Sequence, residues 1–164
     1  MNLISKLLQP SHVLLDLDVA SKKRVFEQVG LLFENSLEIP RGTVFDSLFN
    51  RERLGSTALG HGIAIPHGRV KGLKEASCAF VRTKKPIPFD APDARSVNLV
   101  FVILVPEHAA ERHLEILSEL AQMFSEESMR GALERCEAPE AAHKLLTEWS
   151  PPYATNQRPA ALRG

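Results

Sequence analysis

The sequence predicts an α/β fold in which one mixed β-sheet is sandwiched between helices. Segments with strand-like and helical apolar spacing alternate along the chain, an order typical of a sheet covered by helices. Residues 97–105 (VNLVFVILV) are apolar on both faces, as in a central strand with helices on both sides. With 44% hydrophobic residues among 164, the chain has enough apolar mass for one domain, which we expect at residues 1–150.

The first third of the chain is expected to form one strand and two helices. Apolar and polar residues alternate over residues 13–19, which predicts a short strand with one mostly polar face. Ser21 is a candidate N-cap for a helix that Pro40 breaks, and a second helix is expected from near Thr43. Residues 56–62 hold small residues and glycines and are expected to form a loop.

The rest of the chain is expected to supply the sheet and the second helical layer. Short strands are predicted at residues 63–65 and 76–82, and Pro86 with Pro88 argues against a central strand directly after the latter. From residue 151 the chain is rich in proline, alanine and arginine without periodicity, which predicts a disordered tail over residues 151–164. Three further helices are expected: residues 111–124, residues 126–135 and a last helix with Pro139 in its first turn.

The net charge and the length of the apolar runs limit which partners the chain can bind and where in the cell it is expected. Lysine plus arginine and aspartate plus glutamate number 20 each, so the formal net charge is zero. This balance argues against a general nucleic-acid binder and against attachment to anionic membranes. The N-terminus lacks the apolar region of a signal peptide, and the longest apolar run, residues 99–105, is too short to cross a bilayer. Two distant cysteines, Cys78 and Cys136, lack metal-ligand spacing, so a cytoplasmic, reduced protein is predicted.

The segment Gly62–Gly68 (GIAIPHG) places a histidine where a predicted strand leaves the core. A neutral imidazole is a competent nucleophile near pH 7, so His67 is a candidate acceptor of a transferred group. His113 follows the predicted central strand, and both histidines would meet at one mouth if the two strands were parallel neighbours. Cationic and hydroxyl groups that a phosphoryl group requires are available nearby in sequence, from Arg51, Arg53, Ser56, Thr57 and Arg69.

Two other interpretations of the histidines remain open on residue spacing alone. A metal site is disfavoured, because no pair of histidines has the i, i+4 spacing and no HExxH or CxxC motif is present. The remaining interpretation is a surface or turn residue, which we favour for His12, His108 and His143. His61, in a glycine-flanked loop, is either such a residue or a polar wall of the site.

Five motifs taken together resemble the type-2 enzyme IIA domain of the phosphoenolpyruvate phosphotransferase system, the mannitol/fructose class. The resemblance extends from about residue 3 to residue 149 and is strongest for the nitrogen-regulatory branch of the class. It implies a mixed sheet flanked by helices. The motifs are RERLGST at residues 51–57, GHGIAIPHGR at 60–69, PIPFD at 86–90, LVP at 104–106 and HLEILSELA at 113–121.

The resemblance also implies roles for individual residues. His67 matches the histidine that is phosphorylated on Nε2, His113 the second histidine of the site, and Arg51 the arginine that lines the pocket. Neither a cofactor nor a metal is implied. Phosphate-binding positions are expected at Ser56, Thr57, Gly68 and Arg69.

As a function, the resemblance implies a phosphohistidine carrier that is regulatory rather than metabolic. The donor would be an HPr-like phosphocarrier, the nitrogen-branch NPr. The targets would be regulated proteins such as potassium-transport or sensor-kinase systems, without nucleic-acid binding or membrane insertion. The alternative is a sugar-transport IIA protein that passes the phosphoryl group from His67 to a fructose or mannitol IIB domain.

Overall fold

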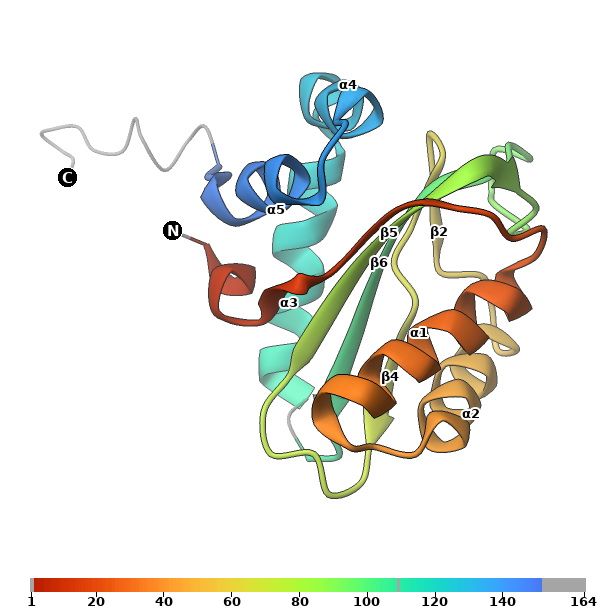
Figure 1. Cartoon of the computed structure of the whole chain (residues 1–164), viewed down its shortest axis with the longest axis vertical. Coiled ribbons are helices and arrows are strands. Elements are labelled where there is room, and N and C mark those ends of the chain that lie inside the picture. The colour runs from red at the N-terminus through yellow and green to blue at the C-terminus, as the bar shows by residue number, and fades with distance from the viewer. Residues whose placement is uncertain (1, 109, 152–164) are drawn as a thin grey trace, which may run out of the picture.

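A six-stranded mixed sheet lies between two layers of helices in the computed structural model, which describes residues 2–108 and 110–151 (Figure 1). The predicted fold class is therefore confirmed. The tail predicted over residues 151–164 falls outside the described residues, apart from Pro151. The strands are β1 (Leu8–Leu17), β2 (Ala58–Gly60), β3 (Ile63–Ala64), β4 (His67–Val70), β5 (Ser77–Ile87) and β6 (Val97–Pro106).

The helices divide between the two faces of the sheet. Helices α1 (Lys22–Leu37) and α2 (Arg41–Glu52) cover one face (Figure 1). The other face is covered by the 3₁₀ turn η1 (Leu3–Lys6), α3 (Ala110–Phe124), α4 (Glu127–Arg135) and α5 (Pro139–Glu148).

Strand β6 is the centre of the sheet, as its apolar sequence predicts. The strand order is β1-β5-β6-β3-β2, and β4 also pairs with β6. Strand β5 is antiparallel to β6, whereas β3 and β4 are both parallel to it and follow one another along the same edge. Ile63 pairs with Leu99 and His67 pairs with Ile103, so β3 and β4 form one line that is interrupted at Ile65–Pro66.

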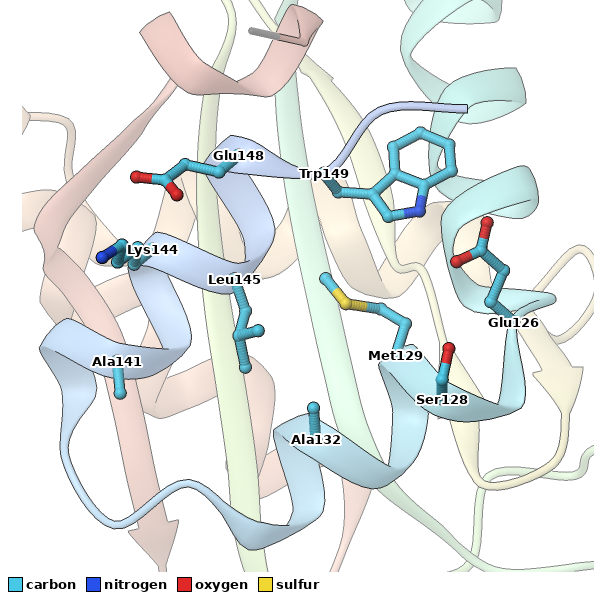
Figure 2. A pocket seen from close by; sticks show the side chains of 9 residues that line it. All are labelled: Glu126, Ser128, Met129, Ala132, Ala141, Lys144, Leu145, Glu148 and Trp149. Carbon is cyan, nitrogen blue, oxygen red and sulfur yellow. The ribbon is translucent and has the colours of Figure 1, made fainter. Parts of the chain in front are cut away.

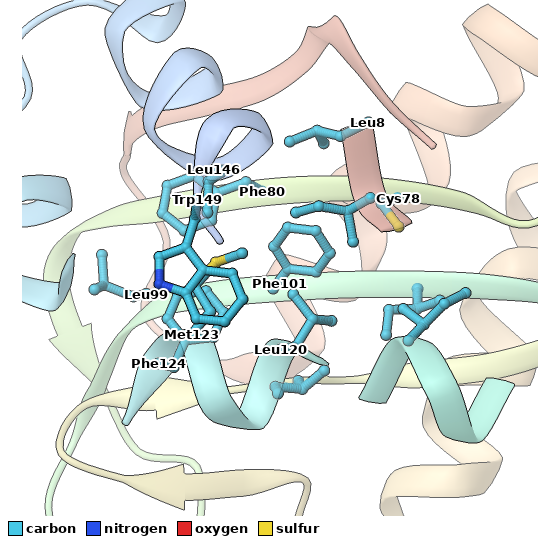
Figure 3. Close-up of a cluster of buried hydrophobic side chains, with 14 of the residues drawn as sticks. Leu8, Cys78, Phe80, Leu99, Phe101, Leu120, Met123, Phe124, Leu146 and Trp149 are labelled. Atoms are coloured by element: carbon cyan, nitrogen blue, oxygen red, sulfur yellow. The ribbon is translucent and has the colours of Figure 1, made fainter. Parts of the chain in front are cut away.

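Alternate side chains of β6 supply two separate cores. Phe101 and Leu99 enter the core under α3, α4 and α5, where Figure 3 shows them beside Phe124, Met123 and Trp149. The side chains between them, such as Val100, enter the core under α1 and α2. Each large apolar side chain that is fully buried in this way contributes about 1.5–3 kcal/mol to folding. The sheet is therefore a rigid support with both faces occupied.

Local signals fix several helix ends as predicted. The Ser21 hydroxyl oxygen accepts a hydrogen bond from the Arg24 amide at 3.3 Å, which caps α1. Pro139 occupies the first turn of α5, where its missing amide hydrogen costs nothing. Helix α2 begins at Arg41 rather than Thr43, because Pro40 itself serves as its N-cap residue.

Three local predictions were wrong. Strand β1 begins at Leu8, five residues before the start that the alternating pattern predicts, and so includes His12. The His12 ring is buried and forms hydrogen bonds with the Cys78 carbonyl and the Ser36 hydroxyl. The interpretation of His12 as a surface or turn residue is therefore wrong. The loop expected at 56–62 contains β2, which pairs with β3. Strand β5 continues through Pro86, and the pairing register with β6 shifts between Arg82 and Ile87, where a proline is tolerated.

Among the described residues, no helix combines the length and apolarity that crossing a bilayer requires.

Helix α2 approaches β4 very closely at Gly68. The Ser47 hydroxyl on α2 donates to the Arg69 carbonyl at 2.8 Å, directly beside that glycine. A Cβ atom at position 68 would lie 3.0 Å from the Ser47 carbonyl carbon and would also collide with the Ser47 hydroxyl. The glycine therefore lets α2, which carries Arg51, lie against the strand that carries His67.

Replacing Gly68 by alanine should lower the free energy of unfolding by about 1–3 kcal/mol, because backbone atoms of α2 must shift to admit the methyl group. Urea denaturation provides the measurement. Gly42→Ala is the matched control, because Gly42 lies on α2 itself and an added Cβ atom there has nothing within 4 Å. This variant should be neutral or should raise the free energy of unfolding by up to about 1 kcal/mol. Equal stabilities of the two variants would contradict the close approach.

Candidate phosphoryl-acceptor site

The imidazole of His67 is oriented by the interruption between β3 and β4. Pro66 lacks an amide hydrogen, but its carbonyl still accepts a hydrogen bond from the Ile103 amide at 3.0 Å, so β4 resumes at the next residue. The Nδ1 atom of His67 lies 2.8 Å from the Ile65 carbonyl oxygen. Because a carbonyl oxygen can only accept, Nδ1 must carry the proton, and Nε2 is left with its lone pair. His67 is the first residue of β4, whereas its sequence context predicts that it follows the end of a strand.

His113, in the first turn of α3, lies beside His67. The two ring centroids are 4.8 Å apart and the ring planes meet at 67°, an edge-to-face arrangement. The Nε2 atom of His113 is buried and has no hydrogen-bond partner among the described residues. A buried polar atom of this kind costs folding energy until a ligand or water satisfies it. The sequence-based expectation that the two histidines share one mouth is met, because β3 and β4 are both parallel to β6.

Two arginines and a shallow cavity complete the site. Arg51, in the last turn of α2, is held by a 2.8 Å hydrogen bond from its Nη1 to the Gly55 carbonyl. Arg69 follows His67 on β4. The cavity has a volume of about 430 Å³ and is lined by Ser47, Asn50, Arg51, Leu54, His67, Gly68, Arg69 and His113.

Burial and neighbouring positive charges lower the pKa of both imidazoles. The pKa of His67 is lowered mainly by burial and also by the charge of Arg51. The hydrogen bond to Ile65 and the Glu52 carboxylate raise it, but they do not cancel the lowering. For His113, burial first, and then the charges of His67, Arg69 and Arg51, lower the pKa to about 4. Near pH 7 the site therefore combines an uncharged nucleophile with two permanent positive charges, a combination that favours an incoming anion.

Ser56 and Thr57 do not reach this cavity. The Ser56 hydroxyl donates to the Phe89 carbonyl at 2.5 Å, and the Thr57 hydroxyl donates to Glu52 at 2.7 Å. Neither residue lines the cavity beside His67. The structure thus gives both hydroxyls partners other than the expected phosphate.

His61 also lies away from the cavity. It occupies the turn between β2 and β3, and its backbone amide donates to the Asp93 carboxylate at 2.9 Å. The positions on β6 that pair with Ile63 and His67 are four residues apart, about 13 Å along a strand. His61 lies beyond the far end of that span, so the structure favours a turn residue over a wall of the site.

Spacing along α2 could have identified two cavity residues that sequence reasoning missed. Ser47 and Asn50 lie four and one residues before Arg51, which places Ser47 on the side of the helix that carries Arg51 and Asn50 next to it, whereas Leu54 lies in the turn after α2. Glu52 is a different case. Its buried carboxylate carries no pattern that distinguishes it from an exposed glutamate.

A larger hollow lies elsewhere, between α4 and α5 (Figure 2). It has a volume of about 620 Å³, and Figure 2 shows Met129, Leu145 and Trp149 along it with Glu126 and Glu148 at its sides. No histidine or cysteine lines it, so it offers no imidazole comparable to that of His67. Within the described ranges, no group of three or more potential ligands suits a metal ion.

Residues 6–149 match the model of one family, described as "Phosphoenolpyruvate-dependent sugar phosphotransferase system, EIIA 2". The chain belongs to the EIIA 2 family. The match covers all the elements that build the cavity, from α2 to α3.

Similar proteins include a nitrogen regulatory protein of Pseudomonas aeruginosa. It is 39% identical over 146 residues, which are 88% of this chain and 95% of that protein. The crystal structure of nitrogen regulatory protein IIA-Ntr from Neisseria meningitidis superposes with a TM-score of 0.85 at 50% identity, covering 89% of this chain and 100% of that one. The IIA mannitol structure from Escherichia coli shares the fold, with a TM-score of 0.70 at 22% identity over 84% of this chain and 97% of that one.

The lowered pKa of His113 should make the fold sensitive to acid. The unfolded chain takes up a proton on this ring as the pH falls through about 6.5, whereas the folded chain resists protonation until about 4. Stability contributed by the neutral ring is therefore complete above 6.5 and is lost between 6.5 and 4. One such group changes the unfolding free energy by at most about 1.4 kcal/mol per pH unit, and solvent screening of a partly exposed ring reduces this.

Urea denaturation at pH 7, 6 and 5 should show a smaller loss of stability in His113→Gln than in the native chain. His12 and His67, whose pKa values are also lowered, retain their share of the acid sensitivity in that variant. An identical pH slope in the two proteins would show that His113 titrates normally.

Proposed function

We propose that this chain carries a phosphoryl group on Nε2 of His67 and that this phosphorylation regulates partner proteins. The observation that carries the proposal is the hydrogen bond from Nδ1 to the Ile65 carbonyl, which leaves Nε2 as the nucleophilic atom. Support comes from Arg51, Arg69 and His113, which line the cavity beside that ring. Membership of the EIIA 2 family supports the same chemistry.

The transfer requires only positioning and charge. Nε2 of His67 attacks the phosphorus, the bond from phosphorus to the donor atom breaks, and the donor leaves with its electron pair. The proton on Nδ1 stays in its hydrogen bond to the Ile65 carbonyl, so no base has to remove it. Arg51 and Arg69 neutralise charge on the equatorial oxygens.

His113 has a supporting role in this scheme. A phosphoryl oxygen is a suitable partner for its buried and unpartnered Nε2 atom. The dianion would also raise the pKa of His113, so the ring becomes a better hydrogen-bond donor once the phosphoryl group arrives. Gly68 contributes by its small size, because it lets α2 and Arg51 lie against β4.

The rim of the cavity suits a docking protein. Leu54, at its edge, is 85% exposed, and Leu114, next to His113, is 67% exposed. Exposed leucines around a reactive centre are typical of a surface that a partner covers. We propose an HPr-like phosphocarrier, NPr, as the donor that covers this rim.

The regulatory role rests on similarity to nitrogen regulatory proteins. Phosphorylation adds roughly two negative charges at neutral pH, a large local change on a chain whose formal net charge is zero. Such a change can determine which targets bind, and potassium-transport or sensor-kinase systems are the proposed targets. Both described cysteines are free, in keeping with the reducing cytoplasm that the proposal implies.

Incubation with phosphoenolpyruvate, enzyme I and the carrier should label the chain, and His67→Ala should abolish the label because the imidazole that accepts the phosphoryl group is removed. The phosphoryl–imidazole bond is acid-labile, so loss of label in acid is the accompanying test. His61→Ala is the matched control, since it removes a histidine of the same segment that lies outside the cavity. Persistent labelling of His67→Ala, or its loss in His61→Ala, would refute the assignment.

The labelled protein also tests the second candidate function, sugar transport, which the family description itself mentions. Purified phosphoprotein mixed with fructose or mannitol IIB domains should keep its label if the chain is regulatory. Rapid transfer to a IIB domain would instead identify a transport component.

Arg51→Ala should slow phosphotransfer by about 2 kcal/mol, roughly 30-fold, because a charged donor to the transferred group is lost. Arg24→Ala is the control, because Arg24 pairs with Glu27 on α1 and does not line the cavity, whereas Arg53 binds the cavity residue Asn50. Single-turnover labelling rates separate the two variants. If both variants match the native rate, Arg51 has no part in the transfer.

A further inference from the structure

We propose that Glu52 is a positioning residue for phosphotransfer, which holds both Arg51 and His67 in place through Thr57. This inference rests on the proposed function, because it concerns the same site. Glu52 does not line the cavity, so it acts through its neighbours rather than on the phosphoryl group.

The Glu52 carboxylate is buried and fully occupied. The residue is 5% exposed, and its two oxygens accept hydrogen bonds from the Thr57 amide at 3.1 Å and the Thr57 hydroxyl at 2.7 Å. Lys22, on α1, donates to the same carboxylate at 3.3 Å. Two of these three bonds go to one residue, so Thr57 is fixed both in position and in orientation.

Two further hydrogen bonds connect Thr57 to the imidazole of His67. The Thr57 carbonyl accepts from the Ile65 amide at 3.0 Å. The Ile65 carbonyl in turn accepts from Nδ1 of His67 at 2.8 Å. An unbroken series of contacts therefore runs from the carboxylate to the imidazole, and each contact constrains the peptide unit that makes the next.

The same carboxylate closes the turn that holds Arg51. Residues 52–57 form a tight turn whose two ends, Glu52 and Thr57, are joined by the carboxylate. Within the turn, the Gly55 amide donates to the Glu52 carbonyl at 3.1 Å. The Gly55 carbonyl accepts from Arg51 at 2.8 Å, so the guanidinium depends on the shape of this turn.

Burying the Glu52 carboxylate costs folding free energy, which indicates that the residue is needed for more than closing the turn. Removing such a charge from water costs several kcal/mol unless ion pairs and hydrogen bonds compensate for it. Lys22 provides the ion pair and is itself held by Asp90 at 3.1 Å and by the ring of Phe89. An apolar side chain would fill the space at lower cost, but it could not bind both donors of Thr57.

The charge of Glu52 also acts on the imidazole. The charged and titratable groups around His67 are Arg51 and Glu52 on α2, Arg69 on β4 and His113 on α3. Among them only Glu52 is negative, and it opposes the lowering of the His67 pKa by Arg51. Loss of this charge and loosening of the Ile65 hydrogen bond both lower the pKa of His67, so the two effects add.

Glu52→Gln and Thr57→Val test the proposal with little change in side-chain volume. Long-range ¹H–¹⁵N NMR should show a lower pKa of His67 and a smaller population of its Nδ1–H tautomer in Glu52→Gln. Thr57→Val should reduce the tautomer population to a smaller extent, because the Thr57 amide still binds Glu52. Single-turnover phosphotransfer should slow by roughly tenfold in Glu52→Gln, as for a misplaced electrostatic donor.

Two controls separate positioning from loss of stability. Lys22→Met breaks the same ion pair from the other side but leaves both Thr57 bonds, so it should lower the melting temperature and keep the His67 tautomer. Glu119→Gln alters a carboxylate that accepts from the Leu3 amide on the other helical layer, and should leave His67 unchanged.

A native pKa and tautomer of His67 in Glu52→Gln would overturn the proposal, as would equal changes in Lys22→Met. The NMR measurements require no phosphoryl donor. They therefore remain decisive for Glu52 even if the native chain proves not to be labelled on His67.

Discussion

The hydrogen bond between Nδ1 of His67 and the Ile65 carbonyl is the interaction on which the site depends. It exists because the line formed by β3 and β4 is interrupted at Ile65–Pro66, which turns the Ile65 carbonyl towards the side chain two residues later. The bond selects one tautomer and thereby the reactive nitrogen. Pairing of His67 with Ile103 on the central strand then fixes the backbone beneath the ring. The orientation of the nucleophile is thus a property of the sheet.

Electrostatics adds a second constraint, since the charged residues that line the cavity, Arg51 and Arg69, are both positive. Burial and Arg51 lower the pKa of both His67 and His113, and Arg69 also lowers that of His113, so the resting cavity keeps its positive charge on the guanidinium groups. A phosphoryl dianion reverses this balance, because it favours protonation of His113 and satisfies an atom that is otherwise buried without a partner.

The sequence predicted the layers of this fold and missed details that depend on contacts distant in sequence. The apolar run of β6, the N-cap at Ser21 and the first-turn Pro139 are local signals, and they were confirmed. His12 was misplaced because its burial depends on Ser36 and Cys78, which lie far along the chain. Motif spacing brought His67, His113 and Arg51 forward together, but it could not reveal that Thr57 binds a neighbouring carboxylate. A hydroxyl near a glycine-rich loop has the same local pattern whether it binds phosphate or supports the loop.

Both helical layers contribute residues to the cavity, which explains how a local charge can alter a surface. Arg51 comes from α2 on one face of the sheet and His113 from α3 on the other, and the two faces have separate hydrophobic cores. In the described part of the chain β4 pairs only with β6, and α2 packs against it through the bond from Ser47 to the Arg69 carbonyl. A phosphoryl group on His67 would interact with both layers at once, beside the exposed Leu54 and Leu114. A change of charge there modifies the surface that a target meets, and no movement of the cores is required.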